Sequence, residues 1–302
     1  MPICDEPYVH STAGFAEIEG FLKRTARFGD MPANWLHGQL ENWAYAGKPT
    51  TLFYGDNVRL WRHNSGTLVA FAISESGEEL HLQVHPAQRE IEADMLQWGI
   101  EVWGQGRTHI DVLCLVNDAH RKELLTERGF VDQGESGRLR QYDLMAAEAP
   151  PQVPTGFSML SLAEGGNIPG RIRTEALTFQ SEAIDAAWFA GKSSAPGYDP
   201  SWDLGVMSPS GEWVAFALAW PDHDNALAEI DPVGTHPDHR QRGLARALLL
   251  ELFARLRAAG IRQAYIGSAA EPYYANRLYE ALGPARMQVQ HRWRLALDGR
   301  QP

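Results

Sequence analysis

The sequence predicts an α/β fold with a mixed sheet, built from two tandem copies of one unit. Three observations support this prediction. Similar short segments recur in the same order in both halves, the apolar segments among them alternate as strands do, and between them lie stretches with the spacing of amphipathic helices. At 302 residues the chain is long enough for two ordinary domains.

The repeat has four landmarks, which are in order an apolar strand, a His-Pro pair, a helix end and a closing strand. The pairs are LVAFAI (68–73) with WVAFAL (213–218), His85-Pro86 with His236-Pro237, KELLTERGF (122–130) with NRLYEALGP (276–284), and RQYDL with HRWRL. We therefore expect each copy to contain a strand hairpin, a strand, a helix, a strand, a helix and a final strand pair.

The second copy shows these elements most clearly. Leucines at every fourth position from Leu244 fall on one helix face, and Gly260 is a natural helix stop. Pro272 and Gly283 mark the start and end of the second helix. The predicted elements are a hairpin over 212–220 and 226–233, a helix over 242–259, a strand over 263–268 and a helix over 272–282.

The segment AAEAPPQVP, residues 146–154, contains three prolines and no periodicity, which is typical of a linker. We therefore expect domains over residues 1–145 and 155–302.

Composition narrows the class of partner. A formal net charge of −11 argues against nucleic acid and anionic membranes as partners. Cys4 and Cys114 provide neither a disulfide framework nor a thiolate metal site, and the histidines lack metal-ligand spacing. The sequence contains neither the apolar segment of a secretory signal peptide nor an apolar stretch long enough to span a membrane, so we expect a cytoplasmic protein. We expect it to be a monomer or a homodimer.

The segment HRQRGLARALL (239–249) places Arg240, Arg242 and Arg246 around Gly243 at a predicted helix start. Acids are normally favoured there, because the first N–H groups of a helix carry partial positive charge. Arginines beside a glycine at that point favour a phosphate site. The alternative is a solvated basic helix start that Gly243 caps.

These residues resemble the GNAT superfamily of N-acetyltransferases. Arg240, Gly243 and Ala245 match the family's pyrophosphate-binding pattern, Arg/Gln-x-x-Gly-x-Gly/Ala, and ANRLYEALG resembles its fourth helix. The doubled unit resembles tandem GNAT proteins of the mycothiol synthase type. The resemblance implies two GNAT-like domains and acetyl-CoA as cosubstrate. The cosubstrate-binding residues implied are Val233, Thr235, Arg240, Gln241, Arg242, Gly243, Leu244, Ala245 and Asn276.

The first copy differs at the same place. Aligning the His-Pro pairs without a gap puts Glu92 opposite Gly243 and Asp94 opposite Ala245. Carboxylates there would repel a pyrophosphate, and their side chains would block its approach to the backbone. We therefore expect residues 1–145 to form a degenerate GNAT-like domain without a CoA loop.

Acetyl transfer to an amine needs a base, a donor to the thioester oxygen and an acid for the departing thiolate. Alternation predicts that Glu229, Asp231 and Val233 share one face of their strand. In the histone-acetyltransferase branch of the family a Glu on this strand is the base, so the resemblance implies Glu229 as base, acting through water, with Asp231 second. The donor would be a backbone N–H near Val233 on a bulged strand. The alternative is that both acids are solvated.

Tyr279 lies three residues after Asn276, on the same predicted helix face. The resemblance places this Tyr beside the CoA sulfur as the acid and the Asn near the pantetheine arm. Alternatively, Tyr279 is a core aromatic, and Tyr273 or Tyr274 serves as the acid instead.

Two further groups of aromatic residues have no role in these motifs. Trp188, Phe189, Tyr198 and Trp202 form either an acceptor pocket or core, and Trp35, Trp43 and Trp61 hold the first half together or to the second.

We therefore expect an enzyme, a GNAT-type acyl-CoA N-acyltransferase whose C-terminal copy moves acetyl from acetyl-CoA to the primary amine of a small molecule by direct attack. The acidic balance favours a cationic amine. The alternatives are a non-catalytic acyl-CoA-binding or sensor protein and a protein N-acetyltransferase.

Overall fold

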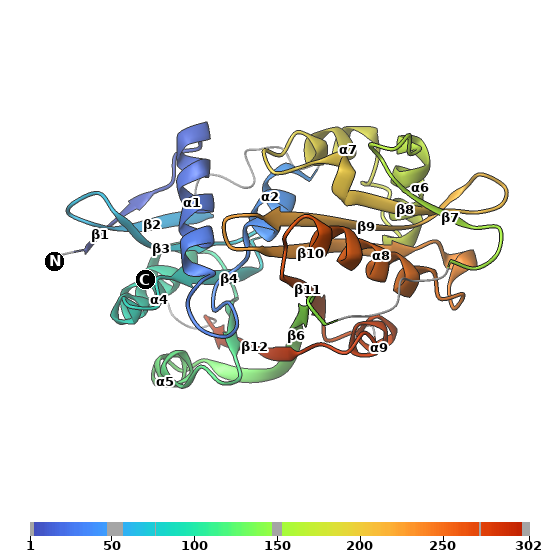
Figure 1. Ribbon diagram of the computed structural model, residues 1–302. Helices are drawn as coiled ribbons and strands as arrows, with labels where there is room; N and C mark the ends of the chain where they lie inside the picture. The colour runs from blue at the N-terminus through green and yellow to red at the C-terminus, as the bar shows by residue number, and fades with distance from the viewer. Residues whose placement is uncertain (1–2, 47–56, 76, 147–152, 272, 298–302) are drawn as a thin grey trace.

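The computed structural model describes residues 3–46, 57–75, 77–146, 153–271 and 273–297. The strands of these residues form one twelve-stranded mixed sheet that runs through the molecule (Figure 1). Helices cover both faces of this sheet, so the predicted α/β class is confirmed. None of the described helices is both long enough and apolar enough to span a bilayer.

Strands and helices follow each other in a similar order in the two halves. The strands are β1 (Ile3–Pro7), β2 (Val58–His63), β3 (Leu68–Ile73), β4 (Glu79–Val84), β5 (His109–Leu115), β6 (Val131–Asp143), β7 (Ser158–Ser161), β8 (Asp203–Met207), β9 (Trp213–Asp222), β10 (Leu227–Thr235), β11 (Gln263–Ala269) and β12 (Arg286–Ala296). The helices are α1 (Thr12–Thr25), α2 (His37–Tyr45), α4 (Glu92–Trp98), α5 (Ala119–Glu127), α6 (Ile168–Phe179), α7 (Ala186–Ser193), α8 (Leu244–Ala258) and α9 (Tyr273–Glu280).

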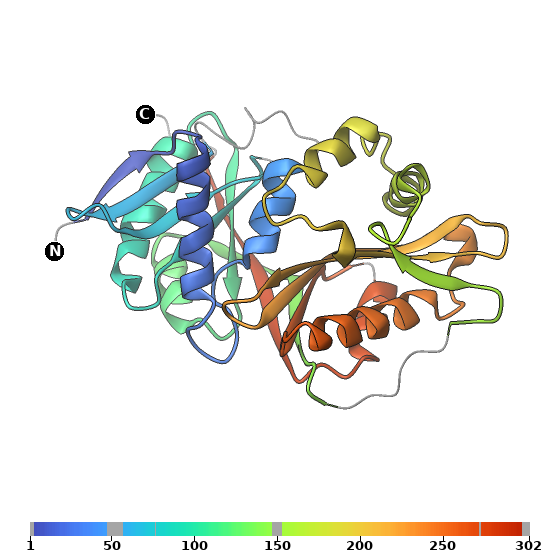
Figure 2. The ribbon, with the colours of Figure 1, turned by 45° about the horizontal axis from the view of Figure 1, so that its top comes forward.

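The closing strand of each half lies in the other half's part of the sheet. The strand order is β1-β2-β3-β4-β5-β12-β6-β11-β10-β9-β8-β7. β12 pairs antiparallel with β5 of the first half, β6 pairs antiparallel with β11 of the second, and β6 and β12 pair with each other. The two halves therefore share one continuous sheet at the centre of the molecule (Figure 2).

This exchange has no signal in the sequence. Both closing strands were predicted, and they are present as β6 and β12, but the repeat does not reveal that they change places. The proposed linker at 146–154 falls mostly on residues outside the described ones. The division into domains over 1–145 and 155–302 therefore stays a prediction.

The predicted elements of the second copy are present. β9 and β10 form the hairpin, β11 follows as a strand, and α8 begins two residues later than predicted, at Leu244. The delay has a local cause, since Gly243 adopts a left-handed conformation with φ of 75° and ends the preceding turn. The second helix is α9; its predicted first residue, Pro272, lies outside the described residues.

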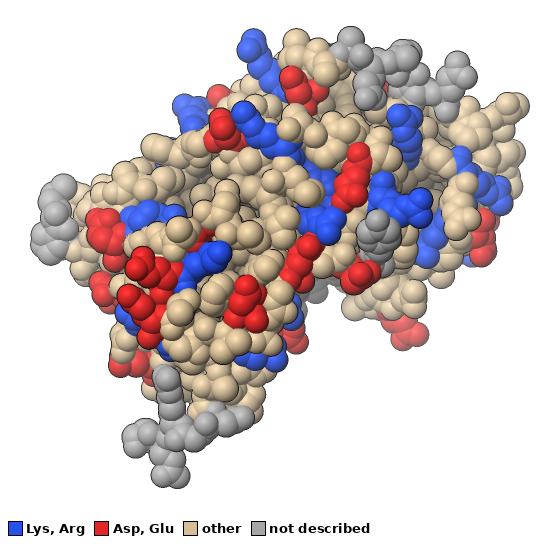
Figure 3. All heavy atoms as spheres, turned by 90° about the horizontal axis from the view of Figure 1, so that it is seen from below, with Lys and Arg blue, Asp and Glu red and all other residues tan. Residues whose placement is uncertain are grey.

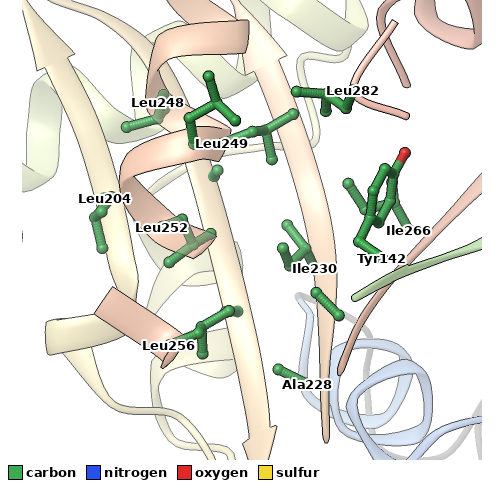
Figure 4. Packing of buried hydrophobic residues seen from close by; sticks show 14 of the residues in the cluster. Tyr142, Leu204, Ala228, Ile230, Leu248, Leu249, Leu252, Leu256, Ile266 and Leu282 are labelled. Atoms are coloured by element: carbon green, nitrogen blue, oxygen red, sulfur yellow. The ribbon is translucent and has the colours of Figure 1, made fainter. Parts of the chain in front are cut away.

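Small side chains on β9 let α8 pack closely on the sheet. Ala215, Ala217 and Ala219 line one face of the strand, and the leucines of α8 fill the space above them. Figure 4 shows Leu248, Leu252 and Leu256 pointing from α8 toward the strands. Helices α4, α5, α8 and α9 cover this face, whereas α1, α2, α6 and α7 cover the opposite one (Figures 1 and 2).

The exchanged strands predict a single cooperative unfolding unit. Neither half completes its sheet alone, because β6 of the first half pairs with β11 of the second and β12 of the second half pairs with β5 of the first. In differential scanning calorimetry we expect one transition, with a van't Hoff to calorimetric enthalpy ratio of about 1. Residues 1–145 produced alone should show no cooperative transition. Two separate transitions in the full chain would contradict this expectation.

Candidate active site

The sheet opens where β10 and β11 separate. The two strands pair in parallel over Leu227–Glu229 and Gln263–Tyr265, and no further pair between them follows in the described chain. On its other side β10 bulges between Ile230 and Val233 in its pairing with β9. Pro232 lies in the bulge and has no N–H to donate to the ladder, which favours an interruption there.

A cavity of about 800 Å³ leads from this gap along the start of α8. β10, the loop after it, α9 and the end of α6 form its other walls. Seven of the nine predicted cosubstrate residues line this cavity, namely Val233, Thr235, Arg240, Gln241, Gly243, Leu244 and Ala245; Arg242 and Asn276 do not.

The N-terminus of α8 presents free N–H groups to this cavity. The helix has no side-chain cap and no acid in its first turn. Its first backbone bond runs from the Ala247 N–H to the Gly243 carbonyl, at 3.0 Å, so the preceding N–H groups have no intrahelical acceptor. A Cβ at Gly243 would meet nothing within 4 Å, so the approach to the backbone is open. This geometry suits a phosphate-like anion.

The positive charges of the arginines around Gly243 are not compensated by carboxylates of the described residues and can act on a bound anion. Nη2 of Arg240 lies 3.4 Å from the Thr178 carbonyl, and Nη2 of Arg242 lies 3.3 Å from the Asp238 carbonyl. Within the described part of the chain, none of the three arginines 240, 242 and 246 forms an ion pair with a carboxylate. A carbonyl orients a guanidinium without neutralising it, so the loop remains cationic.

A second cavity, of about 480 Å³, lies between the two halves. Residues of the first half, including Trp35, Trp43 and His81, form one side, and Glu229 lies on the other. Asp231, Gly267 and Ser268 line both cavities, so the two cavities adjoin at the gap between β10 and β11.

Glu229 is the last paired residue of β10 before the gap, and only 6% of it is exposed. Its Oε2 accepts a hydrogen bond from the Gln39 backbone N–H at 2.7 Å. Burial, together with the neighbouring Asp231 carboxylate, raises the pKa of Glu229 to about 8, while the bond from Gln39 opposes this shift. The carboxyl group is therefore able to exchange a proton near neutral pH.

Asp231 is held from two sides. Its Oδ2 accepts a hydrogen bond from Asn42 Nδ2 at 2.8 Å, and its carbonyl accepts one from Trp220 Nε1 at 2.8 Å. Burial raises the pKa of Asp231, and the Glu175 carboxylate adds to this, while Lys192 and the Asn42 bond oppose it. No cationic side chain among the described residues contacts Glu229 or Asp231 in an ion pair.

Tyr279 lines the first cavity and is 7% exposed. It also belongs to the core cluster around α8, so its ring has a packing role as well. Burial raises the pKa of its phenol, which therefore remains protonated at neutral pH and able to donate. Tyr274 also lines this cavity and is 62% exposed, whereas the side chain of Tyr273 lies outside the described structure.

Asn276 is fully buried, and protein partners occupy its amide. Its Oδ1 accepts from Arg140 Nη2 and from Ser268 Oγ, both at 2.7 Å, and its Nδ2 donates to the carbonyls of Ala269 and Ala270. Contact with a pantetheine arm would require these bonds to change, so that role stays a prediction. In this structure Asn276 ties α9 to β11 and, through Arg140, to β6 of the first half.

One geometric prediction is wrong. Val233 does not share a face with Glu229; it pairs with Ala217 and packs, like Ile230, against the core on the α8 side. The extra residue in the bulge reverses the alternation after Asp231. The bulge itself agrees with the prediction of an interrupted strand at this point.

Of the two alternatives for the aromatic residues before β8, the structure agrees with core packing for Trp188, Phe189 and Tyr198. Phe189 and Tyr198 pack in a cluster with Trp220, and Trp188 lies over Lys192, so these rings belong to the core beneath α7 and do not line the cavity between the halves. Trp35 and Trp43 line it instead. Sequence reasoning expected those two to hold the first half together or to the second, and it missed Gln39 and Asn42, which no motif marks.

In the first half, the position that corresponds to Gly243 is filled by a buried carboxylate with two arginine partners. Glu92, which starts α4, is completely buried and forms ion pairs with Arg89 and Arg121. These arginines hold the pKa of the Glu92 carboxyl below its ordinary value, against the effect of burial. A carboxylate thus occupies the helix start where Gly243 leaves open space in the second half.

Comparison with known proteins agrees with this architecture. Residues 179–283 match the acetyltransferase (GNAT) family. Two solved structures have the same fold over nearly the whole chain. The GCN5-related N-acetyltransferase from Sphaerobacter thermophilus has a TM-score of 0.65 at 21% identity, covering 96% of this chain and 95% of that one. A tandem GNAT protein from the clavulanic acid biosynthesis pathway has a TM-score of 0.64 at 15% identity, with 98% of each chain covered.

The chain therefore has the tandem GNAT fold, and the stretch of its C-terminal half over residues 179–283 is similar to the acetyltransferase (GNAT) family. Curated relatives include the mycothiol acetyltransferases of Geodermatophilus obscurus, 28% identical over 154 residues, and of Thermobispora bispora, 26% identical over 153 residues. These matches cover 48% of this chain and 50% and 52% of the two relatives. The chain thus spans about half the length of the relatives it matches.

The raised pKa of Glu229 predicts a pH-dependent effect on stability. The folded protein holds a proton on this carboxyl up to about pH 8, whereas the unfolded chain loses it near 4.5. The contribution of Glu229 to stability is thus fully present below 4.5 and is lost as pH rises through about 8. Since glutamine does not ionise, the melting temperature of Glu229→Gln relative to wild type should increase from about pH 5 to about pH 9.

The control is Glu127→Gln, at an exposed position on α5. Its melting temperature relative to wild type should stay constant over this range. A constant difference for Glu229→Gln as well would contradict the proposed burial of the Glu229 charge.

Proposed function

We propose that this chain transfers the acetyl group of acetyl-CoA to the primary amine of a small molecule. The observation that supports this most strongly is that two cavities adjoin at the gap between β10 and β11 and share Asp231, Gly267 and Ser268 in their walls. One cavity presents cations and free N–H groups, and the other presents Glu229 beside Asp231. Two reactants that enter from opposite faces of the sheet would meet at the gap.

The first cavity fits the cosubstrate. Its pyrophosphate would lie against the N–H groups of Gly243, Leu244 and Ala245, with Arg240 and Arg242 as counter-charges. Val233 and Thr235 line the path from this loop to the gap. Acetyl-CoA supplies an activated thioester, whose carbonyl carbon the amine attacks as the carbon–sulfur bond breaks.

The chain's own residues provide the proton transfers. Glu229, directly or through a water, takes the proton that the amine loses. A backbone N–H at the bulge, which we assign to Val233, donates to the oxygen on which negative charge develops. The Tyr279 hydroxyl gives its proton to the departing sulfur. Asp231 is the second acid, and its charge makes Glu229 a stronger base.

The acceptor we propose is a cationic amine. Glu229 and Asp231 line the second cavity, and in the described part of the chain neither forms an ion pair with a cationic side chain; the chain as a whole has a net charge of −11. On the face shown in Figure 3, acidic and basic side chains are interspersed and do not form a continuous basic surface of the kind nucleic acid requires. The relatives named mycothiol acetyltransferase also favour a small-molecule acceptor.

The first half is proposed to be a degenerate copy that binds no CoA. The buried Glu92 and its two arginine partners support this, because an internal carboxylate already satisfies the cations at that helix start. One cosubstrate site per chain follows from this assignment.

Calorimetric titration with acetyl-CoA tests the cosubstrate site. We expect one site per chain in wild type and a loss of at least about tenfold in affinity for Gly243→Glu, because a carboxylate would repel the pyrophosphate. Gly66→Glu is the matched control, since Gly66 also has positive φ with nothing within 4 Å of a Cβ, but lies in the β2–β3 turn. Two sites in wild type, or equal affinities for the two variants, would contradict the assignment.

The pH dependence of turnover tests the base. With an amine acceptor, kcat should rise with pH to a midpoint near 8, as Glu229 loses its proton. Glu229→Gln should lower kcat by about 100-fold or more, with acetyl-CoA affinity changed by less than about twofold. Asp231→Asn should move the midpoint to lower pH, because the Asp231 charge raises the pKa of Glu229. Unchanged turnover in Glu229→Gln would instead favour a non-catalytic acyl-CoA-binding protein.

A further inference from the structure

Helix α2 of the first half contacts the proposed base of the second half directly. Four of the α-helices in the described part of the chain are capped by their own sequence at the third helical N–H. The side chains of Ser11, Asp118, Asn167 and Asp185 accept from the N–H three residues later, in α1, α5, α6 and α7. In α2 the N-cap residue is Leu36, which has no side-chain acceptor.

Glu229 provides the missing cap. The third helical N–H of α2 belongs to Gln39, and its acceptor is Glu229 Oε2, at 2.7 Å. One turn later on the same helix face, Asn42 Nδ2 donates to Asp231 Oδ2 at 2.8 Å. One face of α2 thus holds both acids at the gap, although helix and acids are about 190 residues apart.

A glycine permits this close approach. A Cβ at Gly38 would lie 2.6 Å from the Cβ of Trp220, which is completely buried and pairs across the sheet with Glu229. The first turn of α2 therefore packs directly on the Trp220 side chain. A larger residue at position 38 would push the Gln39 N–H away from the carboxylate.

The geometry points to α2 as a positioning element for the proposed base. Its N-terminus binds the Glu229 carboxylate as a cap from the other half, which fixes the orientation of this side chain toward the gap and favours its ionised form. This inference rests on the proposed function, and it gives the first half a part in the reaction beyond that of a scaffold. Gln39 and Asn42 act through Glu229 and Asp231 and are positioning residues.

The charged side chains near Glu229 do not take the place of its hydrogen bond from the Gln39 N–H. Besides Asp231 on the same strand, the groups that face the pair are Glu175 of α6 and Lys192 of α7, and both act on Asp231. Lys192 forms an ion pair with Glu175 at 3.0 Å, so it is already neutralised. The Gln39 N–H is the hydrogen-bond donor that the structure gives Glu229.

Hydrogen–deuterium exchange tests the cap without any need for turnover. In Glu229→Ala the Gln39 N–H loses its acceptor, so exchange at this amide should be about tenfold faster than in wild type. Glu229→Gln keeps an oxygen acceptor and should stay close to wild type. Equal protection in Glu229→Ala and wild type would overturn the cap. Because this readout is independent of catalysis, it stands or falls separately from the proposed activity.

A second variant pair tests the effect on the base. Gln39→Pro removes the N–H without breaking an intrahelical bond, because first-turn N–H groups have none, and Gln39→Ala retains it. Relative to Gln39→Ala, Gln39→Pro should move the kcat midpoint to higher pH and lower kcat at neutral pH by about tenfold, with unchanged acetyl-CoA affinity as the test of folding. Identical pH profiles for the two variants would overturn the positioning role.

Discussion

The loss of pairing between β10 and β11 after Glu229 is the constraint on which the rest of the structure depends. A continuous ladder would close the sheet there and separate the two cavities. Pro232 and the bulge interrupt β10, while Gly267 and Ser268 keep side-chain bulk out of the opening on β11. Backbone groups that would otherwise pair within the sheet thus become available to a ligand.

The exchanged strands place the first half against this opening. Because β6 lies beside β11, Arg140 of the first half reaches Ser268 and Asn276 of the second. Helix α2 covers the opposite face and satisfies Glu229 and Asp231. A hydrogen bond that involves a buried charged group such as Arg140 contributes about 1.5–3 kcal/mol, so the halves stabilise each other through residues at the site.

Sequence patterns predicted the features that arise locally. The hairpin, α8 and the loop around Gly243 follow from alternation, leucine spacing and a glycine among arginines, and each is present. Features that depend on distant residues could not be predicted in this way. The strand exchange leaves the repeat unchanged, the bulge reverses the side-chain direction of Val233, and the bonds of Gln39 and Asn42 join residues that no spacing rule connects. Asn276 was expected at the cosubstrate from the family resemblance, and its position on a helix does not reveal that Arg140 and Ser268 hydrogen-bond its amide oxygen.

A crystal structure of the protein with acetyl-CoA tests the central claim most directly. The account predicts one molecule per chain, with its pyrophosphate against the N–H groups at Gly243 and its thioester in the gap beside Val233, facing the cavity that contains Glu229. Density for the cosubstrate in the first half at Glu92, or on a surface that does not reach the gap, would contradict it.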